Sequence, residues 1–180
     1  ITLGTGVGGG IIINGKLYRG SSGSAGEIGH MTLYPDGPKC KCGNKGCVER
    51  YLGAAYLLEN IKETIKKEKN SKILTLVDGD INRVTPLVIE GAARIGDKYA
   101  IEYYDDLGVK LGIALASLIN LFNPEMIVIS GGISKAGNLI RESLVKEIKK
   151  RAFKSAREAV QIVFSKNDRD MGVIGAALLE

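Results

Sequence analysis

The sequence predicts an α/β fold, and three features support that prediction. Residues 126–130 are a short, mostly apolar run between a proline and a glycine pair, which is typical of a buried strand in a parallel or mixed sheet. Residues 97–122 have the pattern of a long helix that is apolar on most of its faces, so we expect it to be central and buried. Near the start of the chain, Asn14-Gly15 separates two apolar runs and predicts a β-hairpin.

Length and composition suit one domain over residues 1–180. The chain has 180 residues, 44% of them hydrophobic, and a formal net charge of +5, which allows a substantial core. No apolar run approaches the roughly 20 residues of a membrane span, no signal peptide is present, and the thiol content fits a reducing cytoplasm. Ile1 to Leu3 already have the pattern of a strand end, with no initiator Met before them. We therefore expect a portion of a longer protein whose N-terminal half is missing.

The excess of basic residues does not favour nucleic-acid binding. After Glu49, lysines alternate with acidic residues at helical i,i+4 spacing, which is the pattern of a solvated helix face. One basic cluster lies at the end of another predicted helix, where cations interact favourably with the helix dipole. That cluster comprises Lys149, Lys150, Arg151, Lys154 and Arg157.

A glycine-rich loop follows the first strand. Its residues are Gly4, Thr5, Gly6, Val7, Gly8, Gly9 and Gly10. The loop contains G-x-G-x-x-G, but it leads into the hairpin of residues 11–18 and no G-K-[ST] follows, which excludes a Rossmann fingerprint and a P-loop. Glycines let backbone N–H groups approach an anion closely, so the loop and its threonine hydroxyl predict a site for nucleotide phosphates. The alternative is a flexible turn, although so many glycines cost much conformational entropy.

All three cysteines and the only histidine lie between Glu27 and Glu49. The four residues are His30, Cys40, Cys42 and Cys47. One imidazole and three thiolates form the complete ligand set of a structural zinc site, which leaves no open position for catalysis. Gly43 and Gly46 allow the backbone to turn so that Cys47 returns to the ion. The alternatives are three unrelated buried cysteines, although flanking lysines indicate an exposed loop, and a disulfide, which would leave one cysteine unpaired.

We expect this zinc loop to hold two carboxylates and the imidazole in one patch. Glu27 lies three residues before His30, and Glu49 lies two residues after Cys47 at the start of a helix. Each carboxylate can accept two hydrogen bonds from hydroxyl groups, and charge-assisted hydrogen bonds are strong. Glu27, His30 and Glu49 therefore predict a binding site for a polyol.

The remaining chain alternates between helices and strands. The predicted elements are a helix over 49–69, a strand or helical turn over 73–77, helices over 85–96 and 97–122, a strand over 126–130, a helix over 135–152, a strand over 160–164 and a helix over 171–179. Thr85 and Asp97 are the expected N-caps, with Pro86 at the first helical position. The first helix has one apolar face, formed by Tyr51, Ala55, Leu58, Ile61 and Ile65.

Gly131 and Gly132 follow the strand over 126–130 and precede a helix. Ligands of open α/β sheets bind beyond the carboxyl ends of the strands. We therefore expect the glycine pair to border the adenosine of a nucleotide, and the alternative is a plain strand-to-helix turn.

Four motifs together resemble those of the ROK family (repressor, open reading frame, kinase), especially its bacterial glucokinases. They are G-T-G-V-G-G-G, E-x-G-H, C-x-C-G-x-x-G-C-x-E and S-G-G-I-S, and the resemblance covers the whole chain. The resemblance implies the actin-like, ribonuclease H-like ATPase fold, of which this chain would be the C-terminal half. It also implies that His30 both binds zinc and touches the sugar, and that Glu27 and Glu49 bind sugar hydroxyls.

The resemblance further implies an ATP-dependent hexose kinase, with glucose as first choice and fructose, mannose or N-acetylmannosamine as alternatives. ATP would bind with Mg²⁺, zinc would be structural, and the protein would form a dimer or tetramer in the cytoplasm. The family's catalytic base is an aspartate in a D-N motif upstream of the glycine loop, which has no match here, so we expect this portion alone to be inactive.

Two other hypotheses remain. The same family includes sugar-responsive transcriptional repressors, in which this domain follows an N-terminal winged helix that binds nucleic acid. The intact glycine loop favours the kinase. A zinc-stabilised scaffold without any ligand is the third hypothesis, and it leaves the glycine loop unexplained.

Overall fold

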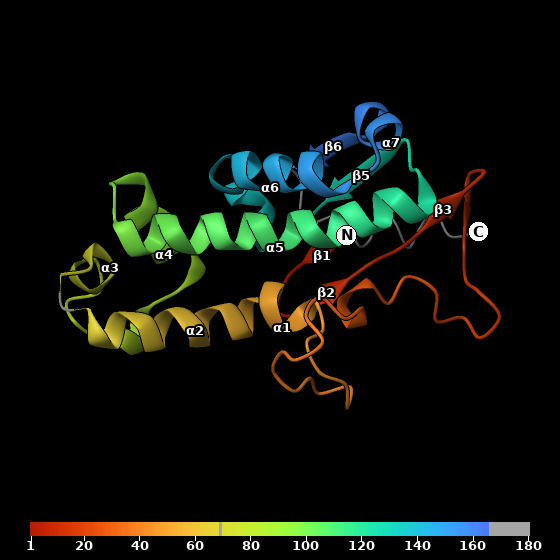
Figure 1. Cartoon of the computed structure of the whole chain (residues 1–180). Coiled ribbons are helices and arrows are strands. Elements are labelled where there is room, and N and C mark those ends of the chain that lie inside the picture. Colours follow the sequence, from red (N-terminus) through yellow and green to blue (C-terminus); the bar gives the residue numbers. More distant parts are fainter. Residues whose placement is uncertain (69, 166–180) are drawn as a thin grey trace.

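The computed structural model describes residues 1–68 and 70–165. The strands are β1 (Thr2–Leu3), β2 (Val7–Gly8), β3 (Ile12–Ile13), β4 (Lys16–Leu17), β5 (Met126–Ile129) and β6 (Gln161–Phe164). The helices are α1 (Glu49–Leu52), α2 (Ala54–Lys67), α3 (Lys72–Thr75), α4 (Pro86–Arg94), α5 (Lys98–Phe122), α6 (Gly137–Arg151) and α7 (Lys154–Ala159), with 3-10 helices η1 (Ile28–His30), η2 (Ile81–Arg83) and η3 (Gly132–Ala136). The helix expected over 171–179 lies outside the described residues. Helices α6, α5 and α2 run roughly parallel across the molecule (Figure 1).

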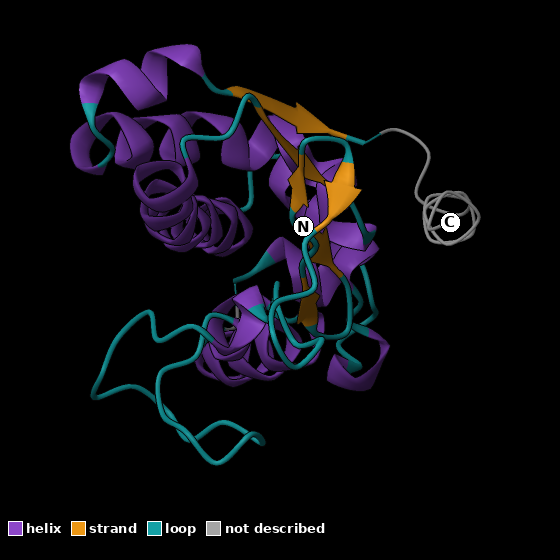
Figure 2. Cartoon of the chain, turned by 90° about the vertical axis from the view of Figure 1, so that its right-hand side faces the viewer, coloured by secondary structure: helices purple, strands orange, loops and turns teal. Residues whose placement is uncertain are grey.

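Four of the described strands form a mixed arrangement, in agreement with the mixed or parallel sheet that the sequence predicted, whereas β3 and β4 pair only with each other. β5 and β6 are parallel, β1 and β2 are antiparallel, and Thr2 forms a parallel bridge to Ser130. The Leu3 N–H donates to the Ser130 carbonyl at 2.8 Å, and the Ser130 N–H donates to the Ile1 carbonyl at 2.8 Å. The spatial order is therefore β2-β1-β5-β6, which places the carboxyl ends of β1 and β5 side by side. Figure 2 shows the strands gathered beside the stacked helices, with long loops projecting away.

Helix α5 is the central buried element, in agreement with its apolar sequence. Its buried residues are Ala100, Tyr104, Leu107, Gly108, Leu111, Gly112, Ala114, Leu115, Ala116, Leu118 and Ile119. Helix α6 packs on it so closely that a Cβ atom at Gly108 would lie 2.6 Å from the Ile140 carbonyl oxygen. The glycines of α5 therefore set the separation of the two helices.

The prediction of a single helix over residues 49–69 is wrong in one respect, because Gly53 divides this stretch into α1 and α2. Gly53 has an extended backbone (φ −71°, ψ 130°), and a Cβ atom there would lie 3.0 Å from the Thr5 carbonyl oxygen. The break brings the start of α2 against the glycine loop, where the Ala54 N–H donates to the Gly4 carbonyl at 2.9 Å. It also shifts the buried face of α2, so that Ala55 is exposed. The fully buried positions of α2 are Leu57, Ile61 and Ile65.

The expected caps are confirmed. Thr85 accepts a hydrogen bond from the Val88 N–H at 3.3 Å, and Asp97 accepts one from the Ala100 N–H at 2.8 Å. For residues 73–77 the sequence allowed either a strand or a helical turn, and this stretch overlaps the short helix α3. The sequence analysis did not predict α7, and the start of the helix expected at residue 135 is divided into η3 and α6.

Among the described residues, no helix combines the length and the apolarity needed to cross a membrane.

Candidate functional site

The predicted metal ligands lie together. One ligand atom from each of His30, Cys40, Cys42 and Cys47 lies within 4.8 Å of the others. The Cys42 and Cys47 sulfur atoms are 3.6 Å apart, and the Cys40 sulfur is 3.9 Å from His30 Nδ1. A tetrahedral zinc ion with Zn–S bonds of about 2.3 Å separates its ligand atoms by about 3.8 Å. The cluster therefore has the donor set and the spacing to hold zinc.

Glycines shape the loop that carries the cysteines. Gly43 and Gly46 both have positive φ (96° and 65°), as expected for positions where the chain turns back. Gly46 also lies against the Tyr34 carbonyl so closely that a Cβ atom would collide with it. The Cys40 N–H donates to the Asn44 carbonyl at 2.7 Å, which closes the tight turn around Cys42.

The thiols of Cys42 and Cys47 differ in acidity. Burial, followed by the neighbouring thiols of Cys42 and Cys40, raises the pKa of Cys47 to about 12. A hydrogen bond from the Asn44 backbone lowers the pKa of Cys42, whose side chain is exposed. The buried Cys47 thiolate therefore requires a cation beside it, whereas Cys42 ionises more readily.

His30 joins the metal cluster to Glu27. It ends the short 3-10 helix η1. Its Nδ1 atom faces the Cys40 sulfur, and its Nε2 atom lies 3.9 Å from Glu27 Oε2. A metal bound at Nδ1 would leave Nε2 to act on a neighbouring polar group.

Glu49 contacts strand β2 directly. It begins α1, and its Oε2 atom accepts a hydrogen bond from the Val7 N–H at 3.1 Å. Val7 is also in close contact with η1, because a Cβ atom at Gly29 would collide with the Val7 carbonyl oxygen. The backbone of β2 therefore connects Glu49 to the segment that carries Glu27 and His30. The sequence analysis missed this role of Val7, which depends on the register in which β1 and β2 pair.

The structure assigns two different roles to the glycines of residues 4–10. None of them has a positive φ, so backbone conformation does not require glycine at these positions. A Cβ atom at Gly6 would collide with the Glu49 carboxylate, and one at Gly9 would collide with the Ile28 side chain. At Gly4 and Gly8, by contrast, a Cβ atom would meet nothing within 4 Å. Internal packing therefore explains Gly6 and Gly9, while Gly4 and Gly8 leave open space through which a ligand can approach the backbone.

The glycine loop contains a short strand that the sequence analysis did not predict. Gly4 to Gly6 form the turn of an antiparallel pair, with the Gly4 N–H donating to the Gly6 carbonyl at 3.0 Å, and residues 7–8 are strand β2. The hairpin expected after it is confirmed, with Asn14 and Gly15 both at positive φ.

The second glycine pair lies at the same sheet edge. Gly131 has φ 95° and lies directly against the Leu3 carbonyl, so the turn after β5 adjoins the turn after β1. A Cβ atom at Gly132 would meet nothing within 4 Å. Beside them the Thr2 and Ser130 hydroxyls are 3.0 Å apart, a polar pair that the sequence analysis missed although Ser130 directly precedes the glycines. The two predicted nucleotide elements therefore share one edge.

Comparison with known proteins identifies the same family as the sequence motifs do. The family model described as "ROK family" matches residues 1–180. A glucokinase of Halalkalibacterium halodurans is 38% identical over 99% of this chain and 54% of the relative. A xylose repressor of Caldicellulosiruptor bescii is 37% identical over 85% of this chain and 38% of the relative.

A solved structure has the same fold. The ROK family glucokinase from Streptomyces griseus, in complex with glucose and AMPPNP, has a TM-score of 0.87 and 35% identity, covering 98% of this chain and 57% of that one. The expected actin-like ATPase fold is thus confirmed. The chain spans about half the length of the curated relatives that it matches.

Proposed function

This chain belongs to the ROK family, and on that basis we propose that it is the C-terminal half of an ATP-dependent hexose kinase that acts on glucose. The support comes from one contact in particular. The hydrogen bond between the Val7 N–H and Glu49 joins the glycine turn to the carboxylate patch, so a phosphate donor and a polyol would be held next to the same short strand.

Glu27, His30 and Glu49 form the proposed sugar site. Glu49 uses Oε2 for the Val7 N–H, which leaves Oε1 to accept a hydrogen bond from a sugar hydroxyl. His30 would offer Nε2 to a second hydroxyl, and Glu27 would accept from a third. When bound by His30, Cys40, Cys42 and Cys47, zinc would neutralise the thiolates and fix the orientation of the His30 ring.

The nucleotide site is proposed at the common edge of β1 and β5. The backbone of residues 4–10 and the exposed Thr5 hydroxyl would bind phosphate, and Gly131 and Gly132 would border the adenosine. ATP would bring Mg²⁺ with its phosphates. These groups position the reactants and neutralise charge, which are the main contributions of a protein to phosphoryl transfer. The base that takes the proton from the sugar hydroxyl would come from outside this chain, so we expect the chain alone to be inactive.

A sugar-responsive repressor is the second candidate, and the similarity to a xylose repressor supports it. The open space at Gly4 and Gly8 favours the kinase, because a protein that only senses sugar has no need for close access to that backbone. Other hexoses remain alternatives to glucose.

The test uses the full-length protein that contains this chain. The kinase proposal expects glucose-dependent release of ADP, whereas a repressor would instead release its DNA on adding sugar. Glu27→Gln should raise the KM for glucose roughly fivefold, because a neutral amide oxygen accepts a weaker hydrogen bond than a carboxylate does, and it should change the KM for ATP little. Glu59→Gln, at an exposed position of α2, is the matched control. Equal effects of Glu27→Gln on both KM values would contradict the assigned role.

A further inference from the structure

The thiols of the metal cluster differ in their access to solvent. Cys42 is exposed, whereas Cys40 and Cys47 are buried. The Cys42 and Cys47 sulfur atoms are 3.6 Å apart, and the Cys40 sulfur lies instead 3.9 Å from His30 Nδ1. The cluster therefore presents one accessible thiol with a buried thiol directly beside it.

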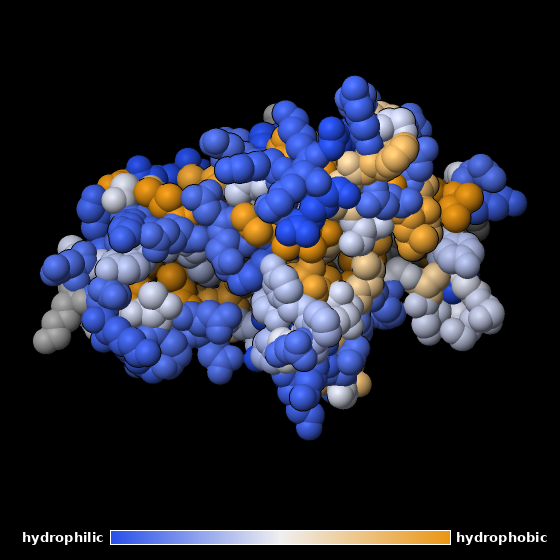
Figure 3. Space-filling view, in the orientation of Figure 1, coloured by the Kyte–Doolittle hydropathy of each residue, from blue (hydrophilic) through white to orange (hydrophobic). Residues whose placement is uncertain are grey.

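The turn around Cys42 has room to move toward Cys47. It is held by hydrogen bonds from the Cys40 N–H to the Asn44 carbonyl at 2.7 Å and from the Gly43 N–H to the Cys40 carbonyl at 3.1 Å. A Cβ atom at Gly43 would meet nothing within 4 Å. The loop lies below α1 in Figure 1, and Figure 3 shows this part of the surface as a mostly hydrophilic projection. Because a disulfide joins its sulfur atoms at about 2.0 Å, a small movement of this open turn is sufficient to form one.

We propose that Cys42 and Cys47 are a modification site at which a hydroperoxide forms an intramolecular disulfide. When zinc is bound, its cysteine ligands are thiolates, which are the nucleophilic form of the side chain. The disulfide would leave only His30 and Cys40 as ligands, whereas a structural zinc site uses four. Oxidation of this pair would therefore abolish metal binding and release the His30 ring.

The reaction balances with hydrogen peroxide as the oxidant. The Cys42 sulfur attacks one peroxide oxygen, the oxygen–oxygen bond breaks and hydroxide leaves, so that Cys42 becomes a sulfenic acid. The Cys47 sulfur then attacks the Cys42 sulfur, the sulfur–sulfur bond forms, the sulfur–oxygen bond breaks and a second hydroxide leaves. The two thiolates together lose two electrons, which the peroxide gains. A dithiol reductant reverses the reaction by thiol–disulfide exchange.

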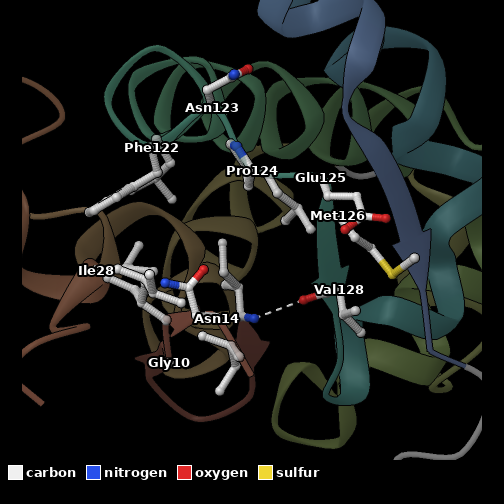
Figure 4. Close-up of a pocket in the computed structure, with 15 residues that line it drawn as sticks. Gly10, Asn14, Ile28, Phe122, Asn123, Pro124, Glu125, Met126 and Val128 are labelled. Carbon is white, nitrogen blue, oxygen red and sulfur yellow. Dashed lines mark hydrogen bonds between the residues drawn. The ribbon is translucent and has the colours of Figure 1, made fainter. Parts of the chain in front are cut away.

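Other sulfur atoms are less well placed for this reaction. Cys40 is 3% exposed and its sulfur faces the His30 ring, so peroxide reaches it less easily. Met126 is 48% exposed and borders the cavity of about 550 Å³ shown in Figure 4. Its thioether can accept an oxygen atom but cannot form a disulfide, so Met126 is an internal reference for unselective oxidation.

The test treats the zinc-loaded chain with hydrogen peroxide. A chromogenic chelator measures zinc release, and peptide mass spectrometry after alkylation of the free thiols locates the disulfide. We expect the Cys42–Cys47 disulfide to form in step with zinc release and before Met126 becomes a sulfoxide. A dithiol reductant and added zinc should then restore the metal content. Retention of zinc until Met126 is oxidised, a first disulfide that includes Cys40, or zinc release without any disulfide would each overturn the proposal.

Two matched variants test the role of the exposed thiol. Cys42→His and Cys40→His each leave two thiols and two imidazoles, a ligand set that structural zinc sites also use. Cys40→His keeps the Cys42–Cys47 pair and should release zinc at nearly the original rate. Cys42→His leaves only buried thiols and should release zinc at least about tenfold more slowly. Equal rates in the two variants would overturn the proposal.

If either variant fails to bind zinc, the location of the disulfide in the unaltered chain decides. No sugar or nucleotide enters these readouts, so their outcome is independent of the kinase assignment. Only the consequence of releasing His30 for sugar binding rests on the proposed function.

Discussion

At the scale of single residues, His30 connects the metal cluster to the polar patch. Its Nδ1 atom faces the thiols and its Nε2 atom faces Glu27. Sequence spacing predicted both roles, because the histidine is unique in the chain and precedes the three cysteines. The spacing did not predict which ring nitrogen serves which partner, since the ring orientation depends on the η1 turn.

Zinc affinity should rise with pH. The pKa of Cys47 is raised to about 12, so at neutral pH the thiol keeps its proton, and each unit of increasing pH makes its thiolate about tenfold more abundant. Because zinc binds thiolates, the apparent affinity should rise at least about tenfold per unit between pH 6 and pH 8. Competition against a chelator of known affinity measures this, and an affinity that is constant with pH would contradict the assignment of Cys47.

Gly131 and Gly132 should respond differently to alanine. At Gly131 the positive φ and the collision with Leu3 should cost about 1–3 kcal/mol of unfolding free energy or more. Gly132→Ala meets no atom and should change stability by less than about 0.5 kcal/mol. If the open face of Gly132 borders the nucleotide, the same variant should weaken ATP binding to the full-length protein by about tenfold. Urea unfolding and calorimetric titration separate the two effects, and unchanged ATP affinity in Gly132→Ala would count against that placement.

At the scale of elements, glycines determine how helices meet. Gly53 ends α1 and lets α2 contact the glycine turn, while Gly108 and Gly112 let α6 approach α5. The apolar pattern of α5 predicted a buried helix, and its small residues indicated close packing. The pattern could not predict the break at Gly53, because a helix tolerates one glycine and the Ala54 N–H bonds to the Gly4 carbonyl, which is distant in the sequence.

Gly108→Ala and Gly91→Ala form a matched pair within helices. Alanine gains about 1 kcal/mol in helix propensity over glycine. At Gly91 the new Cβ atom would meet only the Leu76 side chain at 3.9 Å, so Gly91→Ala should stabilise the protein. At Gly108 it would meet the Ile140 carbonyl at 2.6 Å, and we expect a net loss of about 1–3 kcal/mol. Urea denaturation gives both values, and stabilisation by both variants would show that α5 and α6 can move apart freely.

At the scale of the whole molecule, the metal loop lies outside the main core. The core centres on α5 and α6, whereas Cys42 and the flanking lysines are exposed in a loop below α1 (Figure 1). Zinc should therefore fix the proposed sugar site, formed by Glu27, His30 and Glu49, rather than the fold.

Removal of zinc with a chelator tests this division. Far-ultraviolet circular dichroism should change little, because the long helices do not depend on the loop. Amide exchange should accelerate between Glu27 and Glu49 and remain slow in α5. Acceleration throughout α5 and α6 would show instead that the metal holds the whole domain together.

The sequence by itself determined three features of this protein. The unique histidine and the cysteine spacing predicted the metal cluster, Asn14-Gly15 predicted the hairpin, and the apolar run of α5 predicted the central helix, because each depends on residues close together in the chain. Only the tertiary structure decided which distant groups meet. The Val7 N–H meets Glu49, Gly131 meets Leu3, and Gly6, unlike Gly8, packs against another side chain. The physical reason is that a contact between distant residues depends on strand register and helix separation, and both are set by the packing of the whole core.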